Sequence, residues 1–191
     1  MVDRVKKIVN SVYPISDNAF RKIEDLLEIE KFRKDENFIY RNRRNEKEYF
    51  VLKGITKSYL INPDGDEVTI SFFSEDSILS PYSTRTSKGL STFYYKALTD
   101  IQLASINAGV FENLMIEDLE IRTFANTVLQ NELMLKVEKE IGLVTLTAKE
   151  RLIEFRRKHR LLENLIPHRD IASYLGITNI SLSRLRKDLT D

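Results

Sequence analysis

The sequence predicts an α+β protein in which an antiparallel β-domain precedes a set of helices. Between residues 38 and 106, β-rich runs alternate with turn signals, and after Ala108 the apolar spacing becomes helical. Short strands separated by turns about every 8–12 residues favour a sandwich or barrel. The closing segment 167–187 has the pattern of two short helices joined by a tight turn. The expected order is therefore a β-domain, a long helix and a helical C-terminal domain.

The first part of the chain begins with a predicted helix over residues 15–30, for which Ser16 or Asp17 provides the cap. Glycine turns at Lys53-Gly54 and Asn62-Pro63-Asp64-Gly65 separate the predicted strands that follow. These strands cover residues 38–40, 48–52, 55–61, 67–73, 92–98 and 100–106.

A long helix is predicted from about residue 117 to residue 144, because this stretch holds no proline and a single glycine. At ~1.5 Å per residue its length is about 40 Å. Ile121, Val128 and Leu135 are seven residues apart, with Phe124 beside them, which is typical of a helix that pairs across a dimer. A helix packed wholly within one chain is the alternative.

A capping box at Thr147-Ala148-Lys149-Glu150 starts the next helix and places a boundary near Thr145. The expected division is a β-domain over residues 1–116, the dimerisation helix over 117–145 and a DNA-binding domain over 146–191.

The segment from Pro167 onward is interpreted as a helix-turn-helix. Ile171, Ala172 and Leu175 lie on one side of a short helix, and Gly176 stands where a left-handed residue ends it. Thr178 then caps a second helix, which is free to enter the major groove of DNA. An ordinary helical hairpin with a polar exposed face is the alternative.

The second helix predicts which residues meet DNA. Asn179, Ser181 and Arg184 are expected at base edges, where arginine pairs with guanine and asparagine with adenine. Leu182 is assigned to the core. The expected phosphate contacts are His168, Arg169, Thr178, Arg186 and Lys187. A dimer would place two such helices ~34 Å apart on an inverted repeat in double-stranded DNA.

Composition excludes several classes of site. The 191 residues include no cysteine, so disulfides and thiolate metal sites are ruled out. From Thr147 onward, ten Lys/Arg stand against six Asp/Glu, a net +4, whereas the preceding residues carry −3. The basic C-terminal part suits a nucleic-acid partner. No apolar run reaches the ~18 residues of a membrane span, so a cytoplasmic protein with no membrane association is expected.

The chain resembles the Crp/Fnr family of bacterial transcription regulators along nearly its whole length. The resemblance is carried by segments 49–54, 64–67 and 97–100 of the β-domain and by residues 171–184. It implies a jelly-roll β-domain of the cyclic-nucleotide-binding type, a dimerisation helix and a winged-helix-like helix-turn-helix domain. It further implies a homodimer that regulates transcription, with RNA polymerase as a candidate partner.

The resemblance fails at the residues that would bind a cyclic nucleotide. Family members that bind one use a Gly-Glu pair, which falls here on Ser80-Pro81, and an Arg-Ser pair, which falls on Ser91-Thr92. Because both charged groups are missing, cAMP is not expected. An unknown small-molecule effector remains open, as does regulation without one. The effector pocket would be formed by Ser80, Tyr82, Arg85, Ser91 and Thr92, although the aromatic residues of this region also suit plain strands.

Haem and iron–sulfur clusters are not expected either. The chain has no cysteine, and its two histidines, His159 and His168, belong to the DNA-binding part. No cofactor or metal site is therefore assigned.

The sequence has two alternative interpretations. A metal-dependent β-barrel enzyme would need histidines on its strands, and none lies in the β-region, so no enzyme activity is expected. A regulatory module that acts through protein contacts, with a vestigial helix-turn-helix, is the other alternative.

Overall fold

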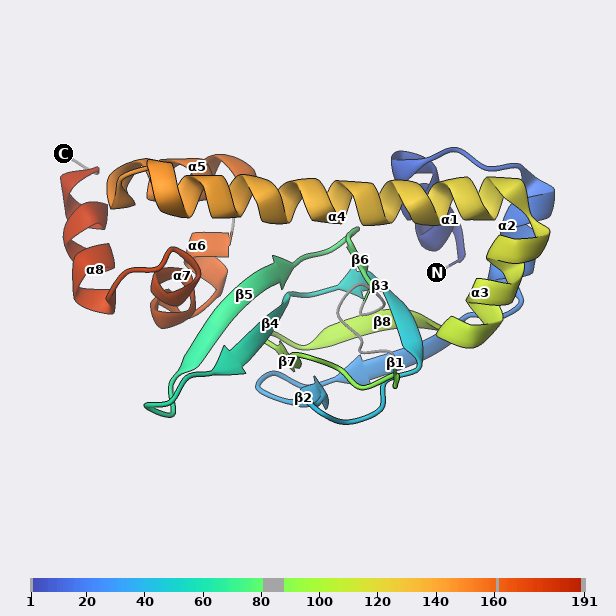
Figure 1. Cartoon of the computed structure of the whole chain (residues 1–191), viewed down its shortest axis with the longest axis horizontal. Helices are drawn as coiled ribbons and strands as arrows, with labels where there is room; N and C mark the ends of the chain where they lie inside the picture. The colour runs from blue at the N-terminus through green and yellow to red at the C-terminus, as the bar shows by residue number, and fades with distance from the viewer. Residues whose placement is uncertain (1, 81–87, 161, 190–191) are drawn as a thin grey trace. The chain divides into compact units, whose positions relative to one another are not determined.

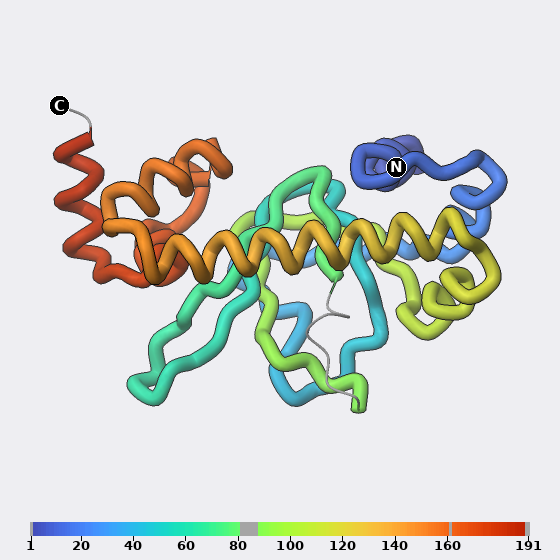
Figure 2. Tube along the Cα trace, turned by 45° about the horizontal axis from the view of Figure 1, so that its top comes forward, coloured from blue at the N-terminus to red at the C-terminus, as the bar shows by residue number. Residues whose placement is uncertain are grey.

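The computed structural model describes residues 2–80, 88–160 and 162–189. The chain forms two compact units, of which the first comprises Met1–Ser58 and Phe72–Glu132 and the second comprises Tyr59–Ser71 and Leu133–Asp191. Figure 1 labels the elements, and Figure 2 follows the same chain as a tube. In the described part of the chain, no helix combines the length and apolarity needed to cross a membrane.

In the part of the chain that the structure describes, eight strands form two antiparallel four-stranded sheets. The strands of the first sheet, in spatial order, are β1 (Glu28–Phe32), β8 (Ile101–Asn107), β3 (Lys47–Lys53) and β6 (Ile78–Leu79). Those of the second are β2 (Asn37–Ile39), β7 (Tyr94–Ala97), β4 (Thr56–Ile61) and β5 (Glu67–Phe73). All six strands expected from the sequence are present, and the α+β prediction is confirmed.

The predicted helix over residues 15–30 is wrong at its C-terminal end. Helix α2 (Asp17–Glu24) begins with Ser16 as its cap, as expected, but it stops at Glu24. Residues 28–32 are strand β1, whose backbone pairs antiparallel with β8, from Glu28 opposite Ser105 to Phe32 opposite Ile101. The tertiary pairing with β8 overrides the local helical spacing of this segment.

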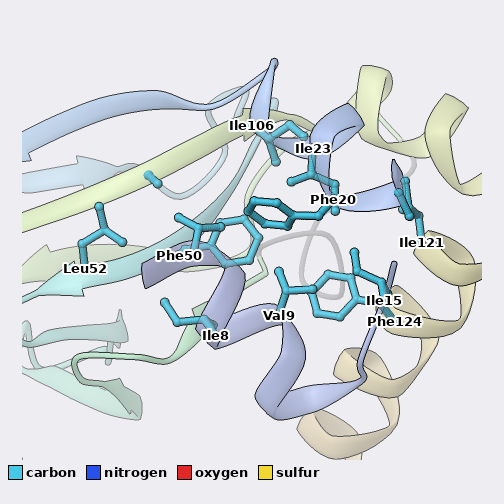
Figure 3. Packing of buried hydrophobic residues seen from close by; sticks show 13 residues of the cluster. Ile8, Val9, Ile15, Phe20, Ile23, Phe50, Leu52, Ile106, Ile121 and Phe124 are labelled. Atoms are coloured by element: carbon cyan, nitrogen blue, oxygen red, sulfur yellow. The ribbon is translucent and has the colours of Figure 1, made fainter. Parts of the chain in front are cut away.

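Three further helices belong to the first unit, wholly or in part: α1 (Val2–Val12), α3 (Ala108–Glu117) and α4 (Leu119–Thr145). Side chains of β3 alternate between two apolar clusters, as the period of a strand requires. Tyr49 and Val51 join residues of both sheets in one cluster. Phe50 and Leu52 point the other way, into a cluster with the helices, which Figure 3 shows.

The start of α4 is part of that second cluster. Ile121 and Phe124 are 0% and 2% exposed, and they pack with Phe20 and Ile106 of the same chain (Figure 3). Both residues were expected on a dimer face. Their burial is complete within one chain, so the alternative of intrachain packing describes this half of the helix.

The second unit consists of the rest of α4, the strand ends that flank the 62–65 turn, and four short helices. These helices are α5 (Ala148–Lys158), α6 (Leu162–Leu165), α7 (His168–Tyr174) and α8 (Asn179–Asp188). The predicted capping box is present, because Thr147 Oγ1 accepts from the Glu150 N–H and Glu150 accepts from the Thr147 N–H. Residues 133–160 and 162–189 contain no strand, so the wing implied by the family resemblance is absent from them.

One side chain of α7 binds the β4–β5 hairpin. Ser173 Oγ accepts a hydrogen bond of 2.8 Å from the Thr69 N–H and donates one of 3.3 Å to the Glu67 carbonyl. A single hydroxyl thus serves two backbone groups of β5.

Lys139 of α4 binds the same hairpin. Its Nζ donates a 2.7 Å hydrogen bond to the Ile70 carbonyl and lies 3.9 Å from the centre of the Tyr174 ring. The ring face stabilises the ammonium, as in other cation–π pairs. Burial nevertheless lowers the pKa of Lys139 from 10.5 to about 8, with a smaller contribution from the charge of Lys136. We call the contacts of Lys139 and Ser173 with the hairpin the hairpin clamp.

Gly54 and Gly65 give a matched test of how backbone space limits the fold. Both have positive φ, +86° and +90°, but a Cβ at Gly54 would lie 2.4 Å from the Asp100 carbonyl oxygen, whereas nothing lies within 4 Å at Gly65. Gly65→Ala should cost about 1–2 kcal/mol for its conformation alone. Gly54→Ala should cost about 1–3 kcal/mol more, because of the overlap. Urea unfolding of the two variants measures the difference, and equal losses would contradict the close approach.

Lys139 gives a pH test of the hairpin clamp. In ¹³C-lysine-labelled protein, the Lys139 side chain should titrate at about pH 8, whereas a value near 10.5 would mean that water reaches the ammonium. Because the folded pKa lies below the unfolded one, the unfolded chain binds more protons above pH 8. This residue's contribution to the free energy of unfolding should therefore rise with pH through this window. Lys139→Met should abolish the rise. The free energy of unfolding is measured only up to about pH 10. Above that pH, Tyr174 adds a pH dependence of its own, because burial raises its pKa from 10.0.

Candidate nucleic-acid interface

The turn between α7 and α8 has the geometry that the sequence predicts. Gly176 has φ +67°, and the Ile177 N–H donates to the Ala172 carbonyl at 3.0 Å, which closes the C-terminal end of α7. Thr178 caps α8 by accepting a hydrogen bond from the Ser181 N–H. Ile171 and Leu182 are both fully buried. The two helices therefore share a core, and one side of α8 is left open.

The open side of α8 is polar. Asn179, Arg184 and Lys187 are exposed, and the spacing of Arg184 and Lys187 places these two on the side of the helix away from buried Leu182. Ser181 is half-buried, and its Oγ lies 2.9 Å from Thr178 Oγ1. Of the three residues expected at base edges, Asn179 and Arg184 thus extend into solvent, whereas the Ser181 hydroxyl is held close to the cap.

Two of the residues expected at phosphates make contacts within the chain. Arg186 Nε lies 2.7 Å from Glu163 Oε1, and Arg186 Nη1 lies 2.6 Å from Nε2 of His168. Arg156 binds the same carboxylate with two hydrogen bonds of 2.7 and 2.9 Å. The other expected phosphate contacts, Arg169, Thr178 and Lys187, are exposed.

Glu163 is the centre of this ion-pair network. Its side chain is only 11% exposed, and its pKa is lowered, chiefly by the hydrogen bond from Arg156. A carboxylate between two arginines satisfies charges that would otherwise be buried without a partner. Glu163 cannot be recognised from the sequence, because an acidic residue in a short connecting helix carries no pattern that reveals its partners.

Arg151 was also missed, and it holds the turn from behind. Its Nε donates to the Leu175 carbonyl at 2.9 Å, and its Nη1 donates to the Leu146 carbonyl at 2.7 Å. Both acceptors lie at helix ends, where carbonyls lack partners within the helix. The guanidinium therefore ties the end of α4 to the end of α7. In the sequence, Arg151 is one of several basic residues on α5, and nothing distinguishes it.

The residues expected in an effector pocket are only partly described. Tyr82 and Arg85 lie outside the described residues. Ser80 follows β6 and is half-buried, and Thr92 is half-buried before β7. Ser91 is completely buried: its Oγ donates to the Phe93 carbonyl at 2.7 Å and its N–H donates to the Arg43 carbonyl at 3.0 Å. The Ser91 hydroxyl is thus engaged in the loop itself.

Comparison with known proteins agrees with this architecture. The model of the cyclic nucleotide-binding domain family matches residues 29–118. The chain is 23% identical to the global nitrogen regulator of Nostoc sp., with 100% of this chain and 89% of that protein covered. Its identity to the global nitrogen regulator of Synechococcus elongatus is 26%, with 86% and 80% covered.

Solved structures share the fold. FixK2 from Bradyrhizobium japonicum superposes with a TM-score of 0.76 at 22% identity, covering 86% of this chain and 84% of that one. A transcriptional regulator of the Crp/Fnr family from Eubacterium rectale gives a TM-score of 0.72 at 16% identity, with 94% and 88% covered. A β-domain of the cyclic-nucleotide-binding type, a long helix and a helix-turn-helix follow one another here as in these relatives. Along nearly its whole length, the chain is thus similar to global nitrogen regulators and shares its fold with a regulator of the Crp/Fnr family.

Proposed function

We propose that this protein is a homodimeric regulator that reads an inverted repeat in double-stranded DNA through α8, under the control of an effector other than cAMP. The observation that carries the proposal is the asymmetry of α8, which buries Leu182 and exposes Asn179, Arg184 and Lys187. Asn179 and Arg184 are proposed at base edges, with Ser181 beside them. RNA polymerase is proposed as a partner of the DNA-bound dimer.

The same proposal divides the chain into a sensor domain over residues 1–116, a dimerisation helix over 117–145 and a DNA-binding domain over 146–191. Phosphate contacts are assigned to Arg169, Thr178 and Lys187. Arg186 and His168 already bind Glu163 or each other, so they would reach DNA only by exchanging those partners.

The dimer face of α4 is proposed on its exposed apolar stripe. Met134, Val137, Ile141 and Val144 follow one another at intervals of three, four and three residues, and Val144 is 82% exposed. This spacing is that of a coiled-coil seam. At about 100° per residue, the stripe lies on the opposite side of the helix from Lys139.

The stripe differs from the heptad of Ile121, Val128 and Leu135. That heptad lies on the side of α4 that carries Lys139, and its first member is buried in its own chain. Val128 is half-buried, and Leu135 remains 58% exposed. The two faces can therefore be told apart by experiment.

Arg184→Ala should lose about 1–3 kcal/mol of discrimination at one guanine position of each half-site, because a bidentate contact is removed. Lys187→Ala is the matched control and should weaken binding to all sequences alike. Selection of bound sequences from a random inverted-repeat library measures both effects. Unchanged preferences for Arg184→Ala would defeat the assignment, and a wild-type protein that enriches no sequence would favour a vestigial helix-turn-helix acting through protein contacts.

Ile141→Glu should raise the dimer dissociation constant by about 100-fold or more, since it places a carboxylate in an apolar seam at a cost of several kcal/mol. Leu135→Glu makes the equivalent change on the other face and should leave the dimer intact. Sedimentation equilibrium reports both constants. The reverse result would place the dimer face on the heptad of residues 121, 128 and 135.

A further inference from the structure

The first unit contains an apolar pocket that the proposed function does not use. It lies between the β3–β8 region of one sheet and the helices α3 and α4, and its volume is about 50 Å³. Phe50 and Ile106 of the sheet face Phe111 of α3 and Ala125 and Val128 of α4 across it. The pocket borders the apolar cluster of Figure 3, with which it shares Phe50, Ile106 and Phe124.

The lining identifies the kind of molecule that fits. Most of the described residues that line it are apolar, the exceptions being Glu48, Tyr49, Ser80 and Glu112, and no lysine, arginine or histidine is among these described residues. A phosphate or a carboxylate would be repelled by Glu48 and Glu112, two acidic residues of the lining. An uncharged apolar molecule would gain by leaving water, because removal of apolar surface from water is favourable.

We infer that this pocket is a binding site for a small uncharged apolar molecule, which acts as the effector of the regulator. The inference rests on the proposed function and names the chemical class of its effector. Met115 in the lining favours such a role, since its flexible side chain adapts to ligands of different shape.

The pocket is compatible with the proposed dimer. Its α4 residues, Phe124, Ala125 and Val128, lie on the side of the helix that faces away from the stripe of Met134, Val137, Ile141 and Val144. A second copy bound at that stripe would therefore leave the pocket free.

The same helix links the pocket to the DNA-binding part. Ala125 and Val128 belong to α4, which runs without interruption to Thr145, two residues before the cap of α5 at Thr147. A ligand that displaces these side chains would press directly on the helix that leads into the helix-turn-helix. An effector must bind two conformations of a regulator with different affinities, and contact with α4 would provide such a difference.

Xenon is the probe for the test, observed through methyl resonances of the full-length protein. Saturable shifts are expected at Ile78, Ile106, Val128 and Leu129, which line the pocket. Ala125→Leu should abolish them by filling the space, whereas Ala148→Leu on α5, outside the pocket, should leave them unchanged. Met115→Ala should strengthen xenon binding by enlarging the space, which keeps the test valid even where Ala125→Leu fails to fold.

Affinity for the selected DNA sequence is measured in parallel. Ala125→Leu mimics a bound ligand and should change that affinity by at least about fivefold, the lower end of ordinary allosteric coupling. Absence of saturable methyl shifts would overturn the site, whatever the protein does with DNA. Xenon binding combined with wild-type DNA affinity in Ala125→Leu would overturn the effector role. A wild-type protein that selects no DNA sequence contradicts the proposed function and leaves the xenon result to decide the site alone.

Discussion

The structure depends on burial of one side of the long helix α4. Near its start, Ile121 and Phe124 complete an apolar cluster with the sheet and the N-terminal helices, and further along Lys139 binds the β4–β5 hairpin and the Tyr174 ring. A single helix thus contributes to the core of both compact units. Burial of side chains such as Phe124 contributes about 3–5 kcal/mol each, so the first half of the helix is held firmly in its unit.

Polar contacts act beside an apolar core in the small C-terminal helices, where Phe155, Ile171 and Leu182 are buried. Glu163 neutralises Arg156 and Arg186, and Arg151 serves the carbonyls at the ends of two helices. A charge network of this kind specifies geometry more than it adds stability, because desolvation offsets much of the attraction. It fixes the position of α8 relative to α7. As a result, Arg186 already has Glu163 as a partner in the absence of DNA.

The sequence predicted those features that depend on local chemistry. Turn glycines, the Ser16, Thr147 and Thr178 caps and the alternation of the strands are all read from neighbouring residues, and all are present. Features that depend on residues far apart in the chain could not be predicted from the sequence. Strand β1 exists because β8 pairs with it, and Glu163 matters because two arginines from other helices reach it. The periodicity of α4 was recognised, but period alone does not show whether a partner or the chain itself covers each face.

The buried Ser91 limits the substitutions that its loop can accept. Its hydroxyl, N–H and carbonyl all have partners inside the chain, with Phe93, Arg43 and Asn42 respectively, and no part of the residue reaches solvent. An arginine at position 91 would enter a closed loop, and it would have to displace these hydrogen bonds. A large side chain at position 91 would thus require the 41–44 turn to be rebuilt. The hydrogen bonds of Ser91 therefore limit which residues this position can accept.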